Sequence, residues 1–323
     1  MSQASMDVSG AQAGSGFAAG VRSALGALAT LFSGATAPAS SGQPLAHQLW
    51  LDTATSTLKK RNGANTAWCR LMHADQAFVN AIDQNLVLET LNGALTTCSV
   101  TYDALSVEGT FLQAGSHTLS TGTTGAVNGT DSGAWATNTW YAVFVICNED
   151  GSLSGVLAST SATAPTLPSG YTRKRRVGWV RSQGTATNLW PTAQRNGDCR
   201  WTSSWSDHKP FDTNPPSSMT DLSLASHAPP STRRVRLSIA FVSRNASYGG
   251  GTAGQFYAIQ RKGVTNDIRW GIVSAANQNC LVHGDTECDA NQAIQHMVTL
   301  GGGATTADFT ATVAVLGWRD DVI

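Results

Sequence analysis

The stretch TWYAVFVIC, residues Thr139–Cys147, is a run of apolar, aromatic and β-branched residues. Such a run bounded by turn residues is typical of a core strand in an all-β sandwich or barrel. The next four residues, Asn148–Gly151, form a turn signal because Asn, Asp and Gly favour turn conformations. Ser154–Ala158 then reads as the following strand. This segment therefore predicts two strands joined by a tight turn.

The same pattern extends from Ala94 to the end of the chain, where short alternating or apolar runs are separated by Gly, Asn, Asp, Pro and Ser. The predicted fold class is mainly β: an N-terminal arm with a short helix, a small β-meander, and then a β-sandwich-like body. The body covers 94–323, either as one unit or as two lobes, 94–200 and 201–323. We expect a long surface loop over Trp205–Pro230, which contains two Pro-Pro pairs. The other clear strands are 176–181, 235–243, 255–260, 268–273 and 310–318.

Composition excludes several functional classes. Charged residues make up 13% of the 323 residues, against about 25% in ordinary soluble proteins. Lys+Arg and Asp+Glu are both 21, so the basic excess of a nucleic-acid-binding protein is missing. We expect no nucleic-acid partner. No apolar run reaches the roughly 18 residues of a membrane span, and no secretory signal is present. We therefore expect synthesis in a cytoplasm and no membrane insertion.

The cysteines are spread along the chain without a C-x-x-C pair, so neither a disulfide framework nor a zinc site is indicated. We expect free and mostly buried thiols. They are Cys69, Cys98, Cys147, Cys199, Cys280 and Cys288.

The N-terminal 35 residues are predicted to be a flexible arm followed by a docking helix. The arm is rich in Ser, Gly and Ala. Apolar residues then recur at steps of three or four, as on one face of a helix. Such a short helix is marginal alone in water, so it needs a partner: its own body, a sister copy or a socket on a larger particle. The candidate docking or oligomer contacts are Phe17, Val21, Leu25, Leu28 and Phe32.

Residues 36–75 are predicted to form a small β-meander, and 76–93 a connector. The expected strands are 48–52, 56–61 and 66–71. Asn62-Gly63 is a strong signal for a hairpin with a type I′ turn. Trp50 and Trp68 can lie on the same face and form the core of this module.

Two stretches resemble bacteriophage proteins. The first stretch is similar to a module found near the N-termini of phage tail fibres and related appendage proteins. It consists of Gly42-Gln43-Pro44, W-x-D-T at Trp50–Thr53, L-K-x-R-N at Leu58–Asn62 and N-x-x-W at Asn65–Trp68. P-x-L-P-x-G-Y at Pro165–Tyr171, followed by Arg176-Val177-Gly178, resembles a β domain of phage fibre and virion proteins. The resemblance implies a particle protein with a docking N-terminus and a β-rich body, usually trimeric. It implies no catalytic residue and no cofactor.

Several residue groups contain side chains that could form a site. His283, Asp285 and Glu287 alternate along the chain and could offer metal ligands, but their spacing matches no known metal motif, so we expect an exposed polar turn and no metal. The basic run Arg173–Arg176 is predicted to lie at a solvated or subunit-pairing edge. No G-x-S-x-G elbow is present, and no fixed-period repeat suggests a glycan-cleaving β-helix. Loop aromatics can contact a sugar or a partner, and the candidate contact cluster is Trp201, Trp205, His208 and Phe211.

The sequence thus favours a non-enzymatic structural subunit of a phage virion appendage, such as a tail fibre, located in the virion. The expected partners are further copies of the chain in a homotrimer and other virion tail or neck proteins. An alternative is a receptor- or glycan-binding module that attaches the particle to its host. A glycan depolymerase is a third reading, against which the missing carboxylate arrangement counts.

Overall fold

The computed structural model describes residues 33–34, 48–55, 57–64, 66–73, 83–243, 255–264, 268–273, 279–300 and 304–320. This part of the chain is mainly β, as the sequence predicts, and its described helices are 3₁₀ turns of three or four residues. The predicted docking helix with Phe17, Val21, Leu25, Leu28 and Phe32 lies outside the described residues.

The N-terminal module is a four-stranded sheet with the predicted tryptophan pair: β2, β3 and β4 form an antiparallel meander, and β1 pairs with β2 in parallel. The rings of Trp50 and Trp68 meet edge to face with their centroids 5.5 Å apart. Lys59 and Arg61 lie over the two rings, 4.8 and 5.4 Å from their centroids. The predicted core of the module is therefore confirmed as a contact. The strands are β1 (Ser33–Gly34), β2 (Leu49–Asp52), β3 (Thr57–Arg61) and β4 (Trp68–His73).

The hairpin between β3 and β4 is confirmed, but its predicted type I′ turn is wrong. The loop runs from Asn62 to Ala67, and neither Asn62 nor Gly63 has a positive φ. Instead the Asn62 side-chain oxygen accepts hydrogen bonds from the backbone N–H groups of Thr66 and Ala67, at 2.7 and 3.3 Å. An Asn side chain can satisfy local backbone donors in this way and so hold a longer loop closed.

The first lobe of the body is a sandwich of two antiparallel sheets. The order β10-β9-β11 forms one sheet, and β12, β6, β7 and β8 belong to the other. Val143 and Val145 of β9 pack in the core between the sheets, whereas Phe144 and Ile146 join a second core on the opposite face. Both faces of β9 are buried, which explains its unbroken apolar sequence. The strands are β5 (Asp83–Gln84), β6 (Val87–Thr90), β7 (Thr97–Val107), β8 (Thr110–Ser120), β9 (Trp140–Cys147), β10 (Ser154–Ser159), β11 (Arg173–Arg181) and β12 (Thr192–Arg195).

The second lobe has β19, β16, β21 and β14 on one side and a sheet of order β15-β20-β17-β18 on the other. In its core the Phe241 ring stacks on Tyr257 and Phe309, with centroids 5.6 and 5.3 Å apart. The elements are β13 (Asp198–Trp201), η2 (Trp205–His208), β14 (Phe211–Thr213), β15 (Thr220–Ser223), β16 (Arg234–Ser243), β17 (Gln255–Arg261), β18 (Ile268–Val273), β19 (Asn279–Glu287), β20 (Ala293–Thr299), η4 (Thr306–Asp308) and β21 (Phe309–Arg319).

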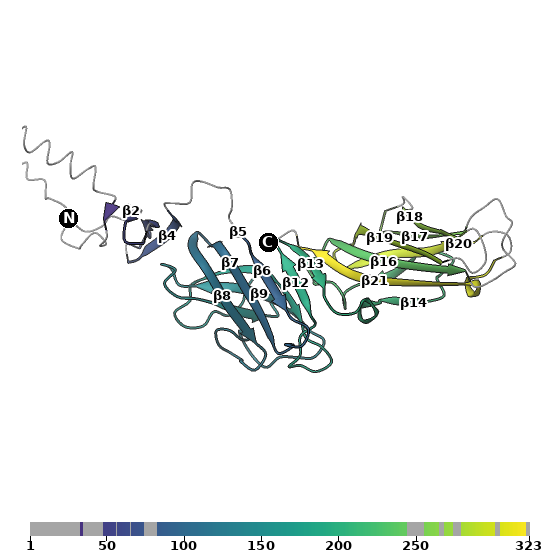
Figure 1. Cartoon of the computed structure of the whole chain (residues 1–323), viewed down its shortest axis with the longest axis horizontal. Helices are drawn as coiled ribbons and strands as arrows, with labels where there is room; N and C mark the ends of the chain where they lie inside the picture. Colours follow the sequence, from purple (N-terminus) through teal and green to yellow (C-terminus); the bar gives the residue numbers. More distant parts are fainter. Residues whose placement is uncertain are drawn as a thin grey trace, which may run out of the picture.

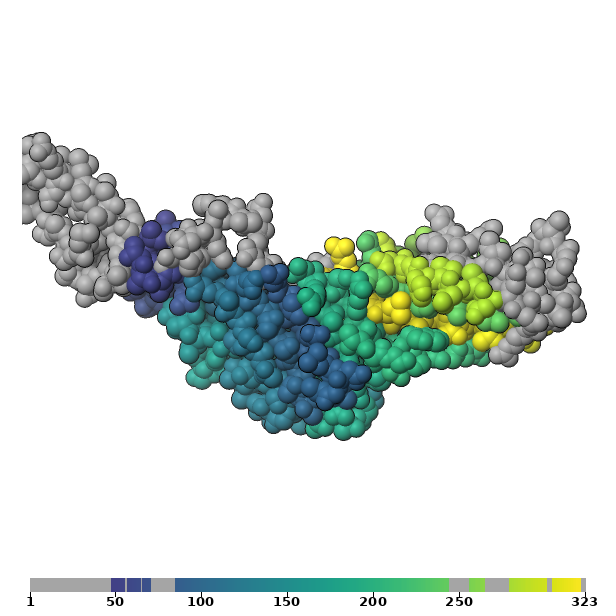
Figure 2. Space-filling model, in the orientation of Figure 1, coloured from purple at the N-terminus to yellow at the C-terminus, as the bar shows by residue number. Residues whose placement is uncertain are grey.

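A single ten-stranded sheet runs through both lobes. Strand β13 pairs with β12 of the first lobe on one side and with β21 of the second lobe on the other. At this join Gly317 lies so close to β13 that an added Cβ would be 2.1 Å from the carbonyl oxygen of Cys199, so only glycine fits. The meander, first lobe and second lobe follow one another along the long axis (Figures 1 and 2).

Three expectations need correction. The connector 76–93 contains β5 and β6, which belong to the ten-stranded sheet rather than to a linker. The segment 205–230 is not only loop, because it contains η2, β14 and β15. His283–Glu287 forms part of the long strand β19 and not a turn. Strands β14, β15 and β19 pair only with strands distant in sequence, and β6 pairs with distant β12 as well as with neighbouring β7, so the local pattern carried little signal.

Candidate functional site: the junction between the lobes

The two lobes meet at a junction built from aromatic and polar side chains. We use the term junction for the region where β9, β11 and β13 of the first part of the body meet β21 and the segment 202–232. One apolar core continues across it, because residues of β9, β11, β13, β16 and β21 belong to the same buried cluster. Trp201 and His208 of the sequence-predicted contact cluster lie here.

Four tryptophans form the centre of the junction. Trp201 at the end of β13 lies 5.8 Å from Trp140 and 5.1 Å from Trp318, measured between ring centroids. Trp190 approaches Trp201 edge to face at 6.5 Å. The indole N–H groups of Trp140 and Trp201 donate to the backbone carbonyls of Ala225 and His227. Aromatic pairs of this kind each contribute about 0.5–1.5 kcal/mol beyond area burial, so this cluster holds the lobes together.

His208 is the second component. Its ring stacks on Trp201, with centroids 4.1 Å apart and an interplanar angle of 9°. Burial, with the nearby charges of His227 and Arg181, lowers the pKa of His208 to about 3. The same cause, burial, together with the charge of Arg181 lowers the pKa of His227 to about 4. Both imidazoles are therefore neutral near pH 7.

Ser203 and His208 form a pair that resembles part of a catalytic dyad. The Ser203 Oγ lies 2.6 Å from the His208 Nε2. A general base works best when its pKa lies near the operating pH, and a His with a pKa of about 3 is too weak a base to activate a serine at neutral pH. Among the described residues no carboxylate contacts the His208 ring to orient it. The arrangement fits a buried structural hydrogen bond better than a nucleophile.

The predicted contact cluster does not form one surface. Trp201 and His208 are 8% and 2% exposed, so the junction encloses them. Phe211 is half-buried in β14 and packs edge to face on His296 with centroids 4.5 Å apart. Trp205 is 52% exposed, and Lys209 lies over its ring. Of the four, only Trp205 presents most of its surface to solvent.

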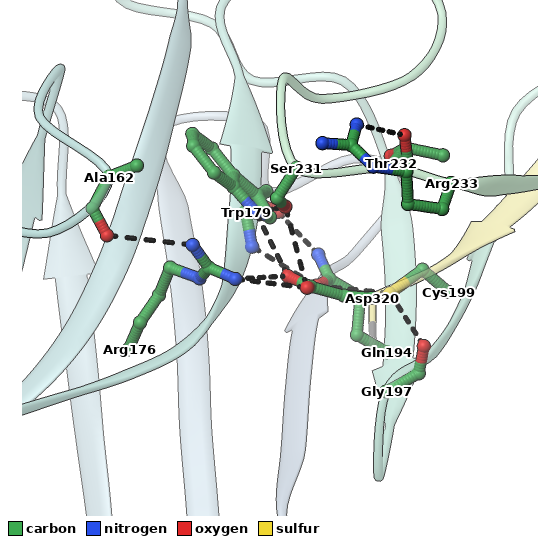
Figure 3. A network of polar contacts seen from close by, with 10 residues as sticks. All are labelled: Ala162, Arg176, Trp179, Gln194, Gly197, Cys199, Ser231, Thr232, Arg233 and Asp320. Carbon is green, nitrogen blue, oxygen red and sulfur yellow. Dashed lines mark hydrogen bonds and ion pairs between the residues drawn. The ribbon is translucent and has the colours of Figure 1, made fainter. Parts of the chain in front are cut away.

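A buried carboxylate ties the first lobe to the end of β21 (Figure 3). The Asp320 carboxylate accepts hydrogen bonds from Arg176 Nη2 at 2.9 and 3.2 Å, from Trp179 Nε1 at 3.0 Å and from Ser231 Oγ at 3.4 Å. The side chains of Arg176 and Asp320 are 8% and 0% exposed. The Arg176 guanidinium also lies over the Trp179 ring, 5.2 Å from its centroid. The pair is thus buried, with one guanidinium nitrogen in contact with both carboxylate oxygens, and Trp179 and Ser231 supply further donors.

Gln194 extends this network into β12. Its Oε1 accepts from the backbone N–H of Trp179 at 3.1 Å, and its Nε2 donates to the Trp179 carbonyl. The Cys199 thiol donates to the same Oε1 at 3.4 Å. These contacts join β11 to the ten-stranded sheet across the sandwich. They hold the backbone of Trp179 in place, and the indole N–H of this residue is one of the donors to the Asp320 carboxylate.

The basic run Arg173–Arg176 lies in β11, which is an edge strand of the sheet β10-β9-β11 as predicted, but its side chains are half-buried rather than fully solvated. Arg173 donates to the Glu108 carbonyl at 2.5 Å, and Arg175 to the Ser106 carbonyl at 2.9 Å. Arg176 makes the ion pair with Asp320. Three of the four basic side chains therefore bond the chain to itself, and the run is part of β11.

Other chemical groups are engaged in structural contacts. Asp285 pairs with Arg236 at 3.3 Å and Glu287 with Arg261 at 3.0 Å, on the exposed side of β19. Within the part of the chain that the structure describes, no group of three His, Cys, Asp or Glu is placed to hold a metal ion. Nor does any helix in that part have the length and apolar character of a membrane span.

The cysteine prediction is confirmed, since all six are free and only Cys280 is more than slightly exposed. Burial raises the pKa of Cys98 and of Cys147 to about 12. A thiolate, not a thiol, is the reactive form. These buried cysteines are therefore poor nucleophiles.

Sequence reasoning missed the Arg176–Asp320 pair. The two residues are 144 positions apart, and neither belongs to a recognisable motif. One local signal was present: alternation along β21 places Trp318 and Asp320 on the same, buried face. A carboxylate following a buried tryptophan at that spacing needs a cationic partner.

Comparison with known proteins adds no family assignment. No protein-family model matches the chain, and no curated protein is significantly similar to it. The functional argument therefore rests on the residues, motifs and geometry described above.

Proposed function

We propose that this chain is a structural, non-catalytic subunit of a bacteriophage virion appendage, such as a tail fibre. The observation that carries the proposal is the junction: one sheet, an aromatic cluster and a buried ion pair join the two lobes into a single elongated body. A body of this kind suits a rod-like element that holds its two ends at a fixed separation. The tryptophan module, whose sequence resembles that of phage fibres, lies at one end of it (Figure 1).

The proposal includes assembly into a homotrimer that attaches to the particle by its N-terminus. Light scattering of the purified full chain measures the oligomer mass directly. A trimer supports the symmetric appendage. A stable monomer across a wide concentration range contradicts it.

Attachment is tested by deleting Met1–Phe32, a segment with the spacing of an apolar helix. We expect the truncated chain to keep the circular dichroism spectrum of the β body and to be missing from purified virus particles. Gold-labelled antibodies against the body, applied to particles made with the full chain, serve as the matched control. Incorporation of the truncated chain at the full-length level contradicts N-terminal docking.

A receptor- or glycan-binding role is the second candidate. Exposed Trp205 favours it, since an aromatic side chain available at the surface can stack on a sugar or contact a partner. Binding of residues 83–323 to host cells or to their extracted surface glycan tests this role. No binding under conditions where whole particles adsorb counts against it, whereas release of reducing ends from that glycan indicates a depolymerase instead.

A further inference from the structure

The outer face of the ten-stranded sheet carries two neighbouring rows of charged residues. Cross-strand partners share a face, so the pairing registers define each row. The first row runs from β12 to β19 through Arg195, Asp198, Arg319, Arg234 and Glu287. The second runs from β13 to β19 through Arg200, Gly317, Arg236 and Asp285. These rows lie on the side of the sheet opposite to the buried Trp318 and Asp320.

A hollow of about 270 Å³ opens where the rows cross from β13 to β19. Three arginines and two aspartates line it: Arg234, Arg236, Arg319, Asp198 and Asp285. Ligand pockets are typically about 300–1,000 Å³, so this hollow has room for about one sugar ring. Its apolar lining residues, Val235 and Trp318, are 0% and 2% exposed. Polar side chains therefore make up the surface that a ligand would meet.

The charges in the hollow are unevenly compensated. Arg236 binds both aspartates, with Asp198 at 3.5 Å and Asp285 at 3.3 Å. Arg234 and Arg319 stand directly opposite each other on β16 and β21. Like charges in that relation are destabilising. Glu287, which opposes Arg234 on β19, pairs with Arg261 instead, and the Arg234 side chain forms no hydrogen bond or ion pair within the described residues.

An anion bound by Arg234 would give this arginine a counter-charge and would offset its repulsion by Arg319 across the strand pair. Arginine presents a planar fork that binds a carboxylate, sulfate or phosphate through two parallel hydrogen bonds. Asp198 and Asp285 keep acceptor capacity, because a carboxylate offers about four lone-pair sites. They can accept hydrogen bonds from hydroxyl groups. A ligand that carries one anionic group and several hydroxyls matches both sets.

We propose that this hollow binds an anionic sugar unit of a polysaccharide, with Arg234 and Arg319 on the acidic group and Asp198 and Asp285 on ring hydroxyls. A nucleic acid fits less well, since the aspartates repel a continuous polyphosphate and the chain has no net positive charge. An acidic peptide fits less well too, because the hollow exposes no apolar anchor site. The inference does not depend on the appendage proposal, as it follows from the hollow alone.

Calorimetric titration of the full chain tests the proposal with defined probes. Oligogalacturonate supplies sugar carboxylates, sulfated dextran supplies sugar sulfates, and the stronger of the two identifies the acidic group. Arg234→Gln is expected to weaken binding roughly tenfold to a hundredfold, the range for losing a hydrogen bond to a charged group. Arg234→Lys keeps the charge but not the fork, so its loss should be smaller.

The matched control is Lys262→Gln, which removes one exposed cation from the β17–β18 turn, away from the hollow. It should bind like the unmodified chain. An unchanged melting temperature shows that each variant is folded, as expected for exposed side chains. The proposal is overturned if neither acidic probe binds, if neutral dextran binds as tightly, or if Lys262→Gln loses as much affinity as Arg234→Gln. Tighter binding of a DNA duplex, with a steep salt dependence, also overturns it.

Discussion

Replacing Asp320 by alanine should strongly destabilise the body, because it leaves Arg176 buried without its counter-ion. In the native chain the Arg176 side chain is only 8% exposed, and Asp320 is its ion-pair partner. The substitution also leaves the Trp179 indole N–H without the carboxylate that accepts from it at 3.0 Å. Removing one partner of a buried ion pair costs about 3–5 kcal/mol of unfolding free energy. Because Asp320→Ala also removes the acceptor of the Trp179 and Ser231 hydrogen bonds, we expect a loss toward the upper end of this range of unfolding free energy.

Urea unfolding followed by tryptophan fluorescence and by circular dichroism measures the effect. With a slope of about 3 kcal/mol per molar urea, the midpoint should fall by roughly 1–2 M. The two probes weight different regions: four of the ten tryptophans lie in the junction, whereas circular dichroism reports the strands of the whole body. If the junction couples the lobes, the two unfolding curves should coincide for the native chain and separate for Asp320→Ala.

Two further variants make the reasoning refutable. Asp198→Ala removes a carboxylate whose side chain is 48% exposed and which pairs with Arg236 at the surface. Because exposed pairs contribute about 0–1 kcal/mol to stability, the urea midpoint of this variant should barely move. The double change Arg176→Met with Asp320→Leu removes both charges, and such replacements are often neutral or stabilising. It should regain most of the loss. If Asp320→Ala costs no more than Asp198→Ala, the buried pair does not hold the lobes together.

Three further outcomes follow from burial. Trp50 is 4% exposed and packs on Trp68, so Trp50→Ala should lower the stability of the meander by about 3 kcal/mol. The measurement is hydrogen exchange over 48–73, which should become faster. Unchanged exchange would show that the contact is not formed. His208 and His296 have their pKa values lowered to about 3 and 4, mainly by burial. The unfolded chain, with pKa near 6.5, therefore binds more protons than the folded chain between about pH 6.5 and 4. Stability should fall across that window as pH is lowered, by about 1–2 kcal/mol per histidine at pH 5 after allowance for solvent screening; urea midpoints that are equal at pH 7 and 5 contradict this. Brief alkylation of the native chain should modify Cys280 first, since the other five thiols are buried, and mass spectrometry of the digested protein identifies the labelled site.

Much of the local structure follows directly from the sequence. The run Thr139–Cys147 predicts β9 to within one residue, and the turn at Asn148–Gly151 returns the chain into β10 as expected. These predictions succeed because strand formation there depends on near neighbours: apolar side chains, then residues that favour a turn. The Trp50–Trp68 contact succeeds for the same reason, since two successive hairpins place β2 and β4 on either side of β3 and fix which residues share a face.

Strands with polar sequences were harder to predict. β19 alternates exposed and half-buried residues, and its polar end was expected to be a turn. Its pairing with β16 makes it a strand, and the partners of its polar end lie 45 to 53 positions away in the chain, from Ser238↔His283 to Arg234↔Glu287. Strand propensity depends on such neighbours more than on the residues themselves.

The sequence by itself determined a mainly β chain with free cysteines, balanced charge and a tryptophan meander, because composition and short-range periodicity are local properties. Only the tertiary structure decided that β13 joins β12 to β21, that Trp201 and His208 are enclosed rather than presented, and that Asp320 neutralises Arg176. Each of these depends on segments far apart in the chain. The physical reason is that burial and ion pairing are decided by which surfaces pack together, and a one-dimensional pattern does not encode that choice.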